Sequence, residues 1–268
     1  MEVFDFNTLL LNGDKKDKEM VFAIGVFDGV HRGHQKIFEC VRAERNKHPG
    51  YESMCITFST NPKNRNTGAL DTLRLREEYV SSFSINSFTI IDFSENFSKI
   101  SASGFASEIM RLFKPRILVV GSDFKCGNPN ESANGEELKQ IFASMGADVE
   151  VKIVDFVLSD SGEKISSTLL RQLIIKGDLE SYSRFSGQDY HLDLLTGPSR
   201  STDGIMTISR EHISQLLPPP GDYEGTFVDS SLQRCPVEIR IDGEGLSIKG
   251  LDASRQADSL FITRRKVK

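Results

Sequence analysis

Short apolar runs alternate with segments of helical spacing along the first two thirds of the chain. The apolar runs are rich in β-branched and aromatic residues, and they predict strands over 21–27, 54–58, 88–93, 116–121 and 149–157. Apolar residues at helical spacing predict helices over 33–47, 71–82, 102–113, 134–145, 167–176 and 179–185. Elements in this order form βαβ units, so we predict an α/β fold with a doubly wound, parallel, Rossmann-like sheet. Such sheets bind ligands at the carboxyl ends of their strands.

The pattern changes after Gly187, where helical spacing is scarce and turn residues become frequent. Three consecutive prolines interrupt this region, and short runs alternate between apolar and polar residues. These features predict a second, smaller, β-rich domain, so we place the domains at 1–187 and 188–268. From about Ala253 onward we expect a helical or frayed tail.

The composition is that of a soluble globular protein, with 38% hydrophobic and 26% charged residues among 268. The formal net charge is -5, and basic residues cluster only at the chain end, which argues against a nucleic-acid partner. No apolar run approaches the roughly 20 residues of a membrane span. Residues 1–20 lack the long apolar core of a secretion signal. We therefore expect a cytoplasmic protein without a membrane partner, and the oligomeric state stays open.

The four cysteines stand singly in the sequence, at Cys40, Cys55, Cys126 and Cys235. No CxxC pair or Cys/His spacing suited to zinc is present. This usage indicates neither a disulfide framework nor a structural zinc site, and it agrees with a reducing compartment.

A candidate phosphate site lies between the first long apolar run and the first long helical segment. Residues 25–34 read GVFDGVHRGH. The three glycines let the backbone turn sharply and approach a ligand, while the N-terminus of the following helix presents N–H groups and a positive dipole end. His31 and His34 lie three positions apart, so both imidazoles can donate to charge that develops on a phosphate. A nucleoside triphosphate suits this pattern.

The segment contains HxGH, the signature of the adenylyl and cytidylyl transferase superfamily. With Gln35 it also resembles the longer string GxFDGVHxGHQ of bacterial FAD synthetases. Three further segments resemble that family's motifs at the expected intervals: ITF followed by NP over 56–62, VVGSDF over 119–124 and ISSTLLR over 165–171. The likeness runs from residue 21 to about residue 190.

The resemblance implies an FMN adenylyltransferase, which transfers AMP from ATP to FMN in the presence of Mg²⁺ and releases FAD and pyrophosphate. It implies a nucleotidylyltransferase domain over 1–187. Its implied catalytic residues are His31, His34 and Arg171. The implied substrate-binding residues are Gly25, Phe27, Asp28, Gly33, Asn61, Asp123, Ser166, Ser167 and Thr168. Protein ligands for the metal are not assigned.

Several of these residues have a structural alternative that the sequence leaves open. The hydroxyls from Ser166 to Thr168 can hold phosphate oxygens or cap a helix. Arg171 can receive the leaving phosphate or stand as a solvated helix charge. Asp123 can bind ribose hydroxyls or cap its loop. Asp28 can orient His31, hold Mg²⁺ through water, or cap the turn.

The chain departs from the family at three places. Asn61 replaces the histidine of the PHP motif, and Cys126 replaces the second aromatic residue of DFxFG. The family's second domain is a riboflavin kinase barrel with a Pro-Thr-Ala-Asn segment, and here the matching region, 204–209, reads GIMTIS. Residues 237–239 still resemble the strand that carries the kinase glutamate. We therefore expect a degenerate kinase-like barrel over 188–268 without riboflavin kinase activity.

Two other functions fit the same residues. One is a different HxGH nucleotidylyltransferase with another phosphorylated acceptor, such as pantetheine phosphate, nicotinamide mononucleotide or glycerol phosphate. The other is a flavin- or nucleotide-binding protein without turnover, which the replaced histidine and the altered second domain keep open. The long FDGVHxGHQ and ISST strings favour FMN adenylyl transfer over both.

Overall fold

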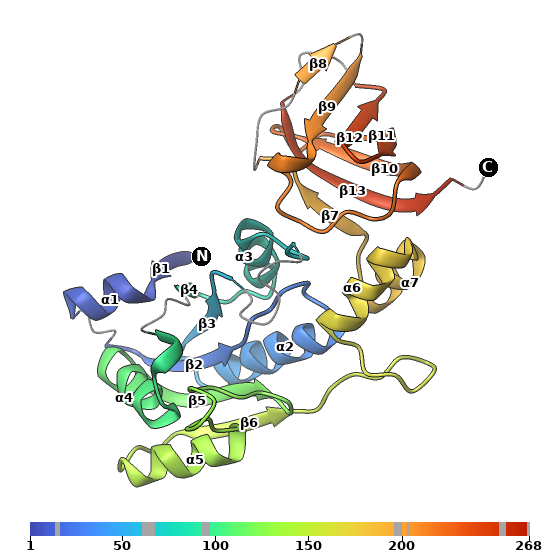
Figure 1. Cartoon of the computed structure of the whole chain (residues 1–268). Helices are drawn as coiled ribbons and strands as arrows, with labels where there is room; N and C mark the ends of the chain where they lie inside the picture. The colour runs from blue at the N-terminus through green and yellow to red at the C-terminus, as the bar shows by residue number, and fades with distance from the viewer. Residues whose placement is uncertain are drawn as a thin grey trace. The chain divides into compact units, whose positions relative to one another are not determined.

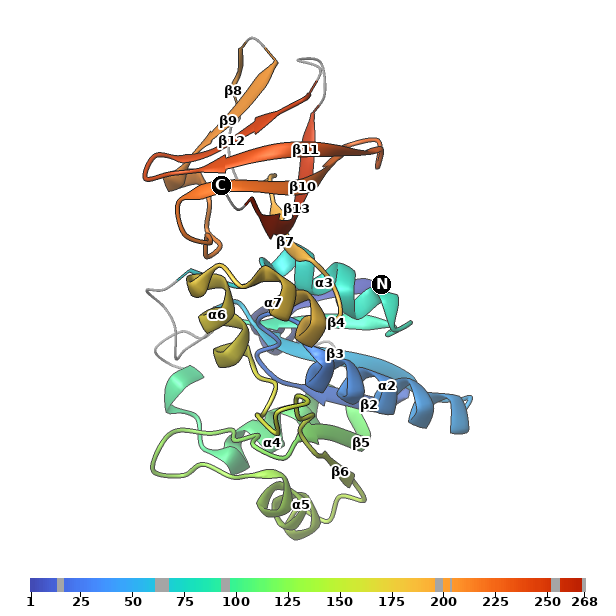
Figure 2. The ribbon, with the colours of Figure 1, turned by 90° about the vertical axis from the view of Figure 1, so that its right-hand side faces the viewer.

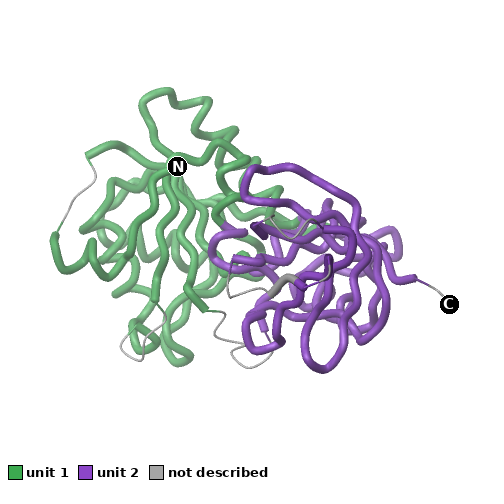
Figure 3. Tube along the Cα trace, turned by 90° about the horizontal axis from the view of Figure 1, so that it is seen from above, with its two compact units in different colours: residues 1–27, 33–63, 77–157 green, residues 28–32, 64–76, 158–268 purple. Residues whose placement is uncertain are grey.

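The computed structural model describes residues 1–13, 17–60, 68–92, 97–195, 200–202, 204–251 and 256–266. Figure 1 labels the helices and strands along the chain. The chain forms two compact units, coloured separately in Figure 3. The first unit comprises residues 1–27, 33–63 and 77–157, and the second comprises residues 28–32, 64–76 and 158–268. The predicted domain boundary after Gly187 falls within the second unit, at the passage from helices to strands, and it stays a prediction.

The first unit contains a six-stranded sheet in the order β1-β4-β3-β2-β5-β6, in which all neighbours are parallel. Its strands are β1 (Glu2–Asp5), β2 (Glu19–Ile24), β3 (Glu52–Phe58), β4 (Ser87–Ile91), β5 (Lys114–Gly121) and β6 (Glu150–Val154). From β2 the chain moves outward through β3 and β4, and then returns to add β5 and β6 on the other side of β2. The predicted doubly wound α/β sheet is thereby confirmed, with the switch in strand order between β2 and β5.

Helices cover both faces of this sheet. They are α1 (Phe6–Asn12), α2 (Arg32–Lys47), α3 (Leu73–Ser82), the 3₁₀ turn η1 (Phe97–Lys99), α4 (Ala102–Leu112) and α5 (Gly135–Ser144). Alternate residues of β2, including Phe22, pack in one cluster with residues of α1, α4 and α5. The residues between them, such as Ala23, are also buried and point to the opposite face. Figures 1 and 2 show α4 and α5 beside β5 and β6.

The second unit contains α6 (Ser167–Lys176), α7 (Leu179–Ser186) and a seven-stranded antiparallel sheet. The strand order is β7-β13-β10-β11-β12-β9-β8, which forms a curled half-barrel. Its strands are β7 (Tyr190–Asp193), β8 (Arg200–Thr202), β9 (Ile205–Ser209), β10 (Gly221–Asp229), β11 (Arg234–Ile241), β12 (Gly245–Lys249) and β13 (Ala257–Arg265), with the 3₁₀ turn η2 (Arg210–His212) after β9. The predicted β-rich module is therefore confirmed, and we call these strands the barrel.

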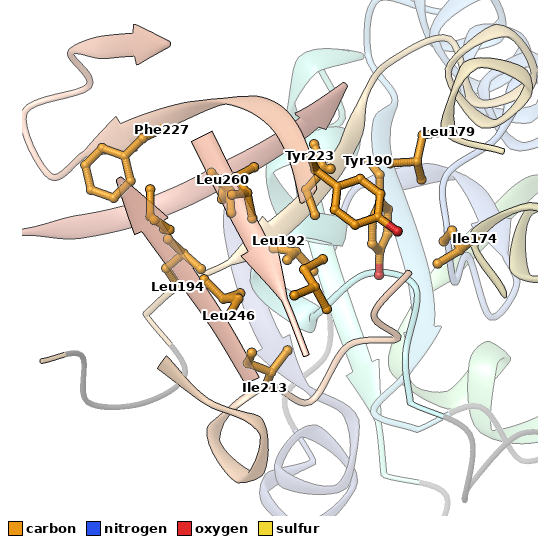
Figure 4. Packing of buried hydrophobic residues seen from close by; sticks show 14 of the residues in the cluster. Ile174, Leu179, Tyr190, Leu192, Leu194, Ile213, Tyr223, Phe227, Leu246 and Leu260 are labelled. Atoms are coloured by element: carbon orange, nitrogen blue, oxygen red, sulfur yellow. The ribbon is translucent and has the colours of Figure 1, made fainter. Parts of the chain in front are cut away.

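One apolar cluster joins the two helices of this unit to the barrel. Ile174 and Leu179 come from the helices, and Tyr190, Tyr223 and Leu260 come from three strands (Figure 4). All five have at most 2% of their surface exposed. Complete burial of a large apolar side chain contributes roughly 1.5–3 kcal/mol, so the helices and the strands stabilise one another.

The chain end differs from the sequence prediction. The tail expected to be helical or frayed from about Ala253 instead contains β13, which pairs with β10 and β7 over Ala257–Arg265. These partners lie far away in the sequence, and a local pattern cannot reveal them. None of the described helices is long and apolar enough to cross a membrane.

Candidate functional site

In the first unit, two predicted site residues lie at the point where the strand order reverses. Gly25 follows the last residue of β2, and its N–H donates to Ile56 O of β3 at 3.1 Å. Asp123 lies in an exposed turn just after β5, the neighbour of β2 on the other side. The carboxyl ends of β2 and β5 therefore place Gly25 and Asp123 at the same edge of the sheet, where doubly wound sheets bind ligands.

An aromatic stack supports the predicted histidine at the start of α2. The Phe27 ring is 1% exposed and meets the His34 ring edge-on, with the ring centroids 5.1 Å apart. Phe38, one turn further along α2, also contacts Phe27, at a centroid distance of 4.8 Å. A Cβ at Gly25 would come within 2.8 Å of the Phe27 ring, so only glycine allows the ring to fold back over the end of β2. Phe27 thus positions His34, and Gly33, the residue before it, is buried at the first turn of α2.

The second unit holds the intervening loop, residues 28–32, through Asp28. The Asp28 carboxylate is 3% exposed, and its Oδ1 accepts from Leu70 N at 2.8 Å and from Asp71 N at 3.2 Å. Its Oδ2 accepts from Arg171 Nη2 at 3.0 Å. These bonds give Asp28 a structural role in joining distant segments, which the sequence did not suggest, and the three roles considered from the sequence stay predictions.

Asp71 in turn accepts a hydrogen bond from the backbone of the loop that contains Asp28. Its Oδ2 accepts a hydrogen bond from Val30 N at 2.9 Å, so each of the two segments donates backbone N–H groups to a carboxylate of the other. Gly29 has a φ of +68°, and a Cβ there would come within 2.5 Å of Leu70 Cδ1. Glycine is therefore required at position 29, where the loop approaches the Leu70 side chain closely.

The Asp71 carboxyl is fully buried, and its pKa is strongly raised. Burial, together with the nearby negative charge of Asp28, raises the pKa of its carboxyl from 3.8 to about 7. Its Oδ1 is buried and has no hydrogen-bond partner among the residues that the structure describes. A proton on this oxygen removes the cost of a second buried negative charge beside Asp28.

His31 lies at the centre of this loop and is 7% exposed. The residue before it, Val30, is held by Asp71, and the residue after it, Arg32, donates through Nε to Arg184 O at 2.8 Å. The backbone before His31 and the side chain after it are therefore both bonded within the second unit.

The N-terminus of α6 contributes the predicted hydroxyl cluster. Ser166 is the N-cap residue, and its side chain accepts from Leu169 N at 3.2 Å, so the capping interpretation holds for this serine. Ser167 donates to Asp28 O at 2.6 Å, which fixes the loop from a third direction. Thr168 is exposed in the first turn of the helix.

Arg171 is buried rather than solvated. It is 8% exposed, and besides its bond to Asp28 it donates through Nη1 to Gly68 O at 2.7 Å. The guanidinium fork therefore connects the loop at 28–32 to the segment that begins at Gly68. Its alternative as a solvated helix charge is excluded by this burial.

The structure thus brings Asp28, Ser167 and Arg171 together in one unit. Gly25, Phe27 and His34 come together in the other, while Asn61 lies outside the described residues. Among the residues that the structure describes, no group of three or more His, Cys, Asp or Glu residues is arranged to hold a metal ion. Asp71 was not among the predicted site residues, because the local pattern indicates only the start of a helix there. Its buried role depends on partners about 40 residues away.

Comparison with known proteins finds relatives for most of this chain. The family model described as FAD synthetase matches residues 13–169. A putative bifunctional riboflavin kinase/FMN adenylyltransferase of Geobacillus thermodenitrificans is 33% identical over 162 residues, which cover 60% of this chain and 85% of that protein. A bifunctional riboflavin kinase/FMN adenylyltransferase of Listeria monocytogenes is 26% identical over 221 residues, covering 79% of this chain and 68% of that protein.

The fold also has a counterpart over its whole length among solved structures. A crystal structure described as a macrolide-efflux protein from Streptococcus pneumoniae matches with a TM-score of 0.81 and 20% sequence identity. The match covers 99% of this chain and 91% of that chain. At this identity the likeness concerns the fold alone, and it includes both the parallel sheet and the barrel.

Proposed function

Because this chain belongs to the FAD synthetase family, a family of nucleotidyltransferase enzymes, we propose that it is an FMN adenylyltransferase. It transfers the AMP group of ATP to FMN, which gives FAD and pyrophosphate. The observation that carries the proposal is the FDGVHRGH segment, which follows the central strand β2 at the switch in strand order and opens α2. A backbone that turns sharply into a helix N-terminus there suits a triphosphate.

His31 and His34 are proposed to act as donors rather than as bases. The FMN phosphate attacks the α-phosphorus of ATP in line, and negative charge grows on the phosphate oxygens as pyrophosphate departs. Imidazole N–H groups held in fixed positions stabilise that charge most strongly in the transition state. The Phe27 contact on His34, the Val30 N bond before His31 and the Arg32 side-chain bond after it support such fixed positions.

Backbone and polar groups are proposed to bind the two substrates. Gly25 and Gly33 let the chain approach the ATP phosphates, and Asp123 binds ribose hydroxyls. Thr168 and the first amides of α6 meet the departing pyrophosphate. Asn61 replaces a histidine on the flavin side, and its amide still donates a hydrogen bond to a phosphate.

The role that we propose for Arg171 differs from that of the two histidines. Its Nη1 and Nη2 bond to Gly68 O and to Asp28, and the side chain is buried. These bonds favour a positioning role, in which the guanidinium fixes the loop that contains His31 and adds a positive charge behind it.

The metal requirement is proposed to be met by MgATP as the substrate. The described residues offer no carboxylate cage, and both oxygens of Asp28 already accept protein hydrogen bonds. Mg²⁺ commonly retains several waters and binds chiefly through substrate phosphates, so a protein cage is not needed. The cytoplasmic location expected from the sequence stays a prediction.

The barrel is proposed to lack riboflavin kinase activity. In the region of the family's Pro-Thr-Ala-Asn segment the chain has β9, which pairs with β12 along its whole length. Glu238, at the position that resembles the kinase glutamate, forms an ion pair with Lys266. The hydrogen bond from Lys266 lowers the pKa of the Glu238 carboxyl, which makes it a weaker base.

The experiment that tests the proposed function offers several acceptors in competition. The purified protein receives MgATP with FMN, pantetheine phosphate, nicotinamide mononucleotide and glycerol phosphate together, and the adenylylated products are separated by mass. We expect FAD as the dominant product. Adenylylation of another acceptor in place of FMN would contradict the flavin assignment, and absence of every product would contradict adenylyl transfer.

A further inference from the structure

We propose that Gln215, in the barrel, is a positioning residue for adenylyl transfer. It acts through residues 68–74, which we call the connecting segment, on the loop at 28–32. The barrel thereby contributes to adenylyl transfer, whether or not it performs a reaction of its own. The kinetic part of this inference rests on the proposed function, while the structural part does not.

The first link joins the connecting segment to the loop. Two backbone N–H groups of the segment donate to Asp28 Oδ1, and Val30 N donates to Asp71 Oδ2. Arg171 adds a bond to Gly68 O. Because His31 follows Val30 directly, a displacement of the segment changes the backbone that carries this histidine.

The second link joins the segment to the barrel through Gln215, which is 1% exposed. Its Nε2 donates to Leu70 O at 2.7 Å and to His191 O at 2.8 Å, and its Oε1 accepts from Asp193 N at 2.7 Å. The amide thus uses both hydrogens and its oxygen, and it bonds the segment and strand β7 at once. No other residue type offers this combination at the same length.

Backbone pairing places Gln215 at this point. Ala69 N donates to Ser214 O at 3.1 Å, and Leu216 N donates to Ala69 O at 2.9 Å, which forms a parallel bridge between residues 69 and 215. The segment therefore behaves as a short added strand beside the 213–217 stretch, with the Gln215 side chain fixing its register.

The third link anchors the far end of the segment on two barrel strands. Thr72 Oγ1 donates to Asp193 Oδ2 at 2.7 Å, and Arg74 Nη2 donates to Asp193 Oδ1 at 2.7 Å. Arg74 also reaches Asp258, at 3.4 Å. Asp193 is 4% exposed, so its charge is balanced mainly by Arg74, and the pair holds the segment more firmly than a surface ion pair would.

A simpler interpretation is that Gln215 only stabilises the barrel. The two interpretations differ in which part of the chain opens more often when Gln215 is substituted. A barrel-only role predicts faster opening of barrel strands, whereas a positioning role predicts faster opening of the loop and the segment, since the amides of Val30, Leu70 and Asp71 depend on this connection.

The test compares Gln215→Met with Ile239→Ala in the full chain by amide hydrogen exchange. Methionine keeps the side-chain length and loses all three hydrogen bonds, while Ile239 is a 2% exposed core residue of β11. We expect Gln215→Met to speed exchange of peptides covering 26–33 and 68–72 by about tenfold or more. The loss of even one of its three buried hydrogen bonds is enough for a change of this size. Ile239→Ala should speed exchange in barrel peptides only. Unchanged exchange at 26–33 in Gln215→Met, or an equal change in both variants, would overturn the inference.

Kinetics of the same two variants complete the test. We expect Gln215→Met to lower kcat for FAD formation by about tenfold or more, with the KM for ATP altered far less, because a misplaced histidine affects the transition state above all. Ile239→Ala should keep kcat near the wild-type value. A normal kcat in Gln215→Met would overturn the positioning role. If the wild-type protein forms no FAD, the proposed function fails, and the exchange result still decides whether Gln215 fixes the loop.

Discussion

Asp28 Oδ2 accepts a hydrogen bond from Arg171 Nη2 at 3.0 Å, and the two residues are 3% and 8% exposed. They lie 143 positions apart in the sequence, so this ion pair connects the start of the chain to α6 within the second unit. Removal of one partner from a buried pair leaves an uncompensated charge, and that is its main energetic consequence.

We expect Arg171→Met to lower the free energy of unfolding by about 3–5 kcal/mol, because Asp28 remains buried without its counter-charge. The double variant Asp28→Asn with Arg171→Met should lose clearly less than the sum of the two single losses. Urea unfolding of the three variants measures this. Strict additivity would show that the two side chains are not coupled.

We expect His31→Ala and His34→Ala each to lower kcat for FAD formation by about 10²-fold or more, with a much smaller effect on ATP binding. The matched control is His48→Ala at the other end of α2, where the imidazole stacks on Tyr51 with centroids 4.7 Å apart. Steady-state kinetics with ATP titration separates kcat from binding. Turnover near the wild-type rate in either variant would remove that histidine from the catalytic set.

The buried carboxyl of Asp71 should make stability depend on pH. Its pKa is raised to about 7 in the folded protein, so the folded state keeps a proton that the unfolded state releases above pH 3.8. The stabilising contribution is therefore complete below about pH 4 and is lost as the pH rises towards 7.

Asp71→Asn should remove this dependence. We compare the free energy of unfolding of the variant with that of the wild type at each pH. This difference should favour the variant by up to a few kcal/mol more at pH 8 than at pH 5, because the asparagine amide needs no proton and can still accept from Val30 N. Chemical unfolding at both pH values measures the difference, with Asp160→Asn at an exposed turn as the control. An equal difference from the wild type at both pH values would contradict the assignment.

We expect no FMN when the full-length protein receives riboflavin and MgATP. The reason is that β9 carries no Thr and Asn pair like that of the kinase segment, and Glu238 is held by Lys266. Fluorescence-detected chromatography follows the flavins, and FAD formation from FMN in a parallel sample shows that the preparation is active. Appreciable FMN from riboflavin would show that the kinase site has been rebuilt from other residues.

Local pattern was sufficient for the central elements of the fold. Strands such as β2 and β5 are buried on both faces, so they read as continuous apolar runs, and α6 was predicted with the bounds 167–176 that the structure shows. The elements that were missed depend on distant partners. β1 is largely exposed and exists because it pairs with β4, and β13 exists because β10 and β7 pair with it.

The candidate site divides in the same way. The string from Gly25 to His34 is contiguous, so its glycines and histidines could be recognised directly. Asp71 and Gln215 could not, because their burial comes from contacts 22 to 145 residues away along the chain. Their residue types alone suggest a helix start and a solvated amide.

The most direct test of the central claim is the stoichiometry of one reaction. The purified protein is incubated with FMN, ATP and Mg²⁺, and FAD and pyrophosphate are quantified together over time, with parallel samples that lack ATP or contain EDTA. We predict that FAD and pyrophosphate appear in equal amounts, and only in the complete mixture. ATP consumption without FAD, or no reaction in the complete mixture, would contradict the account.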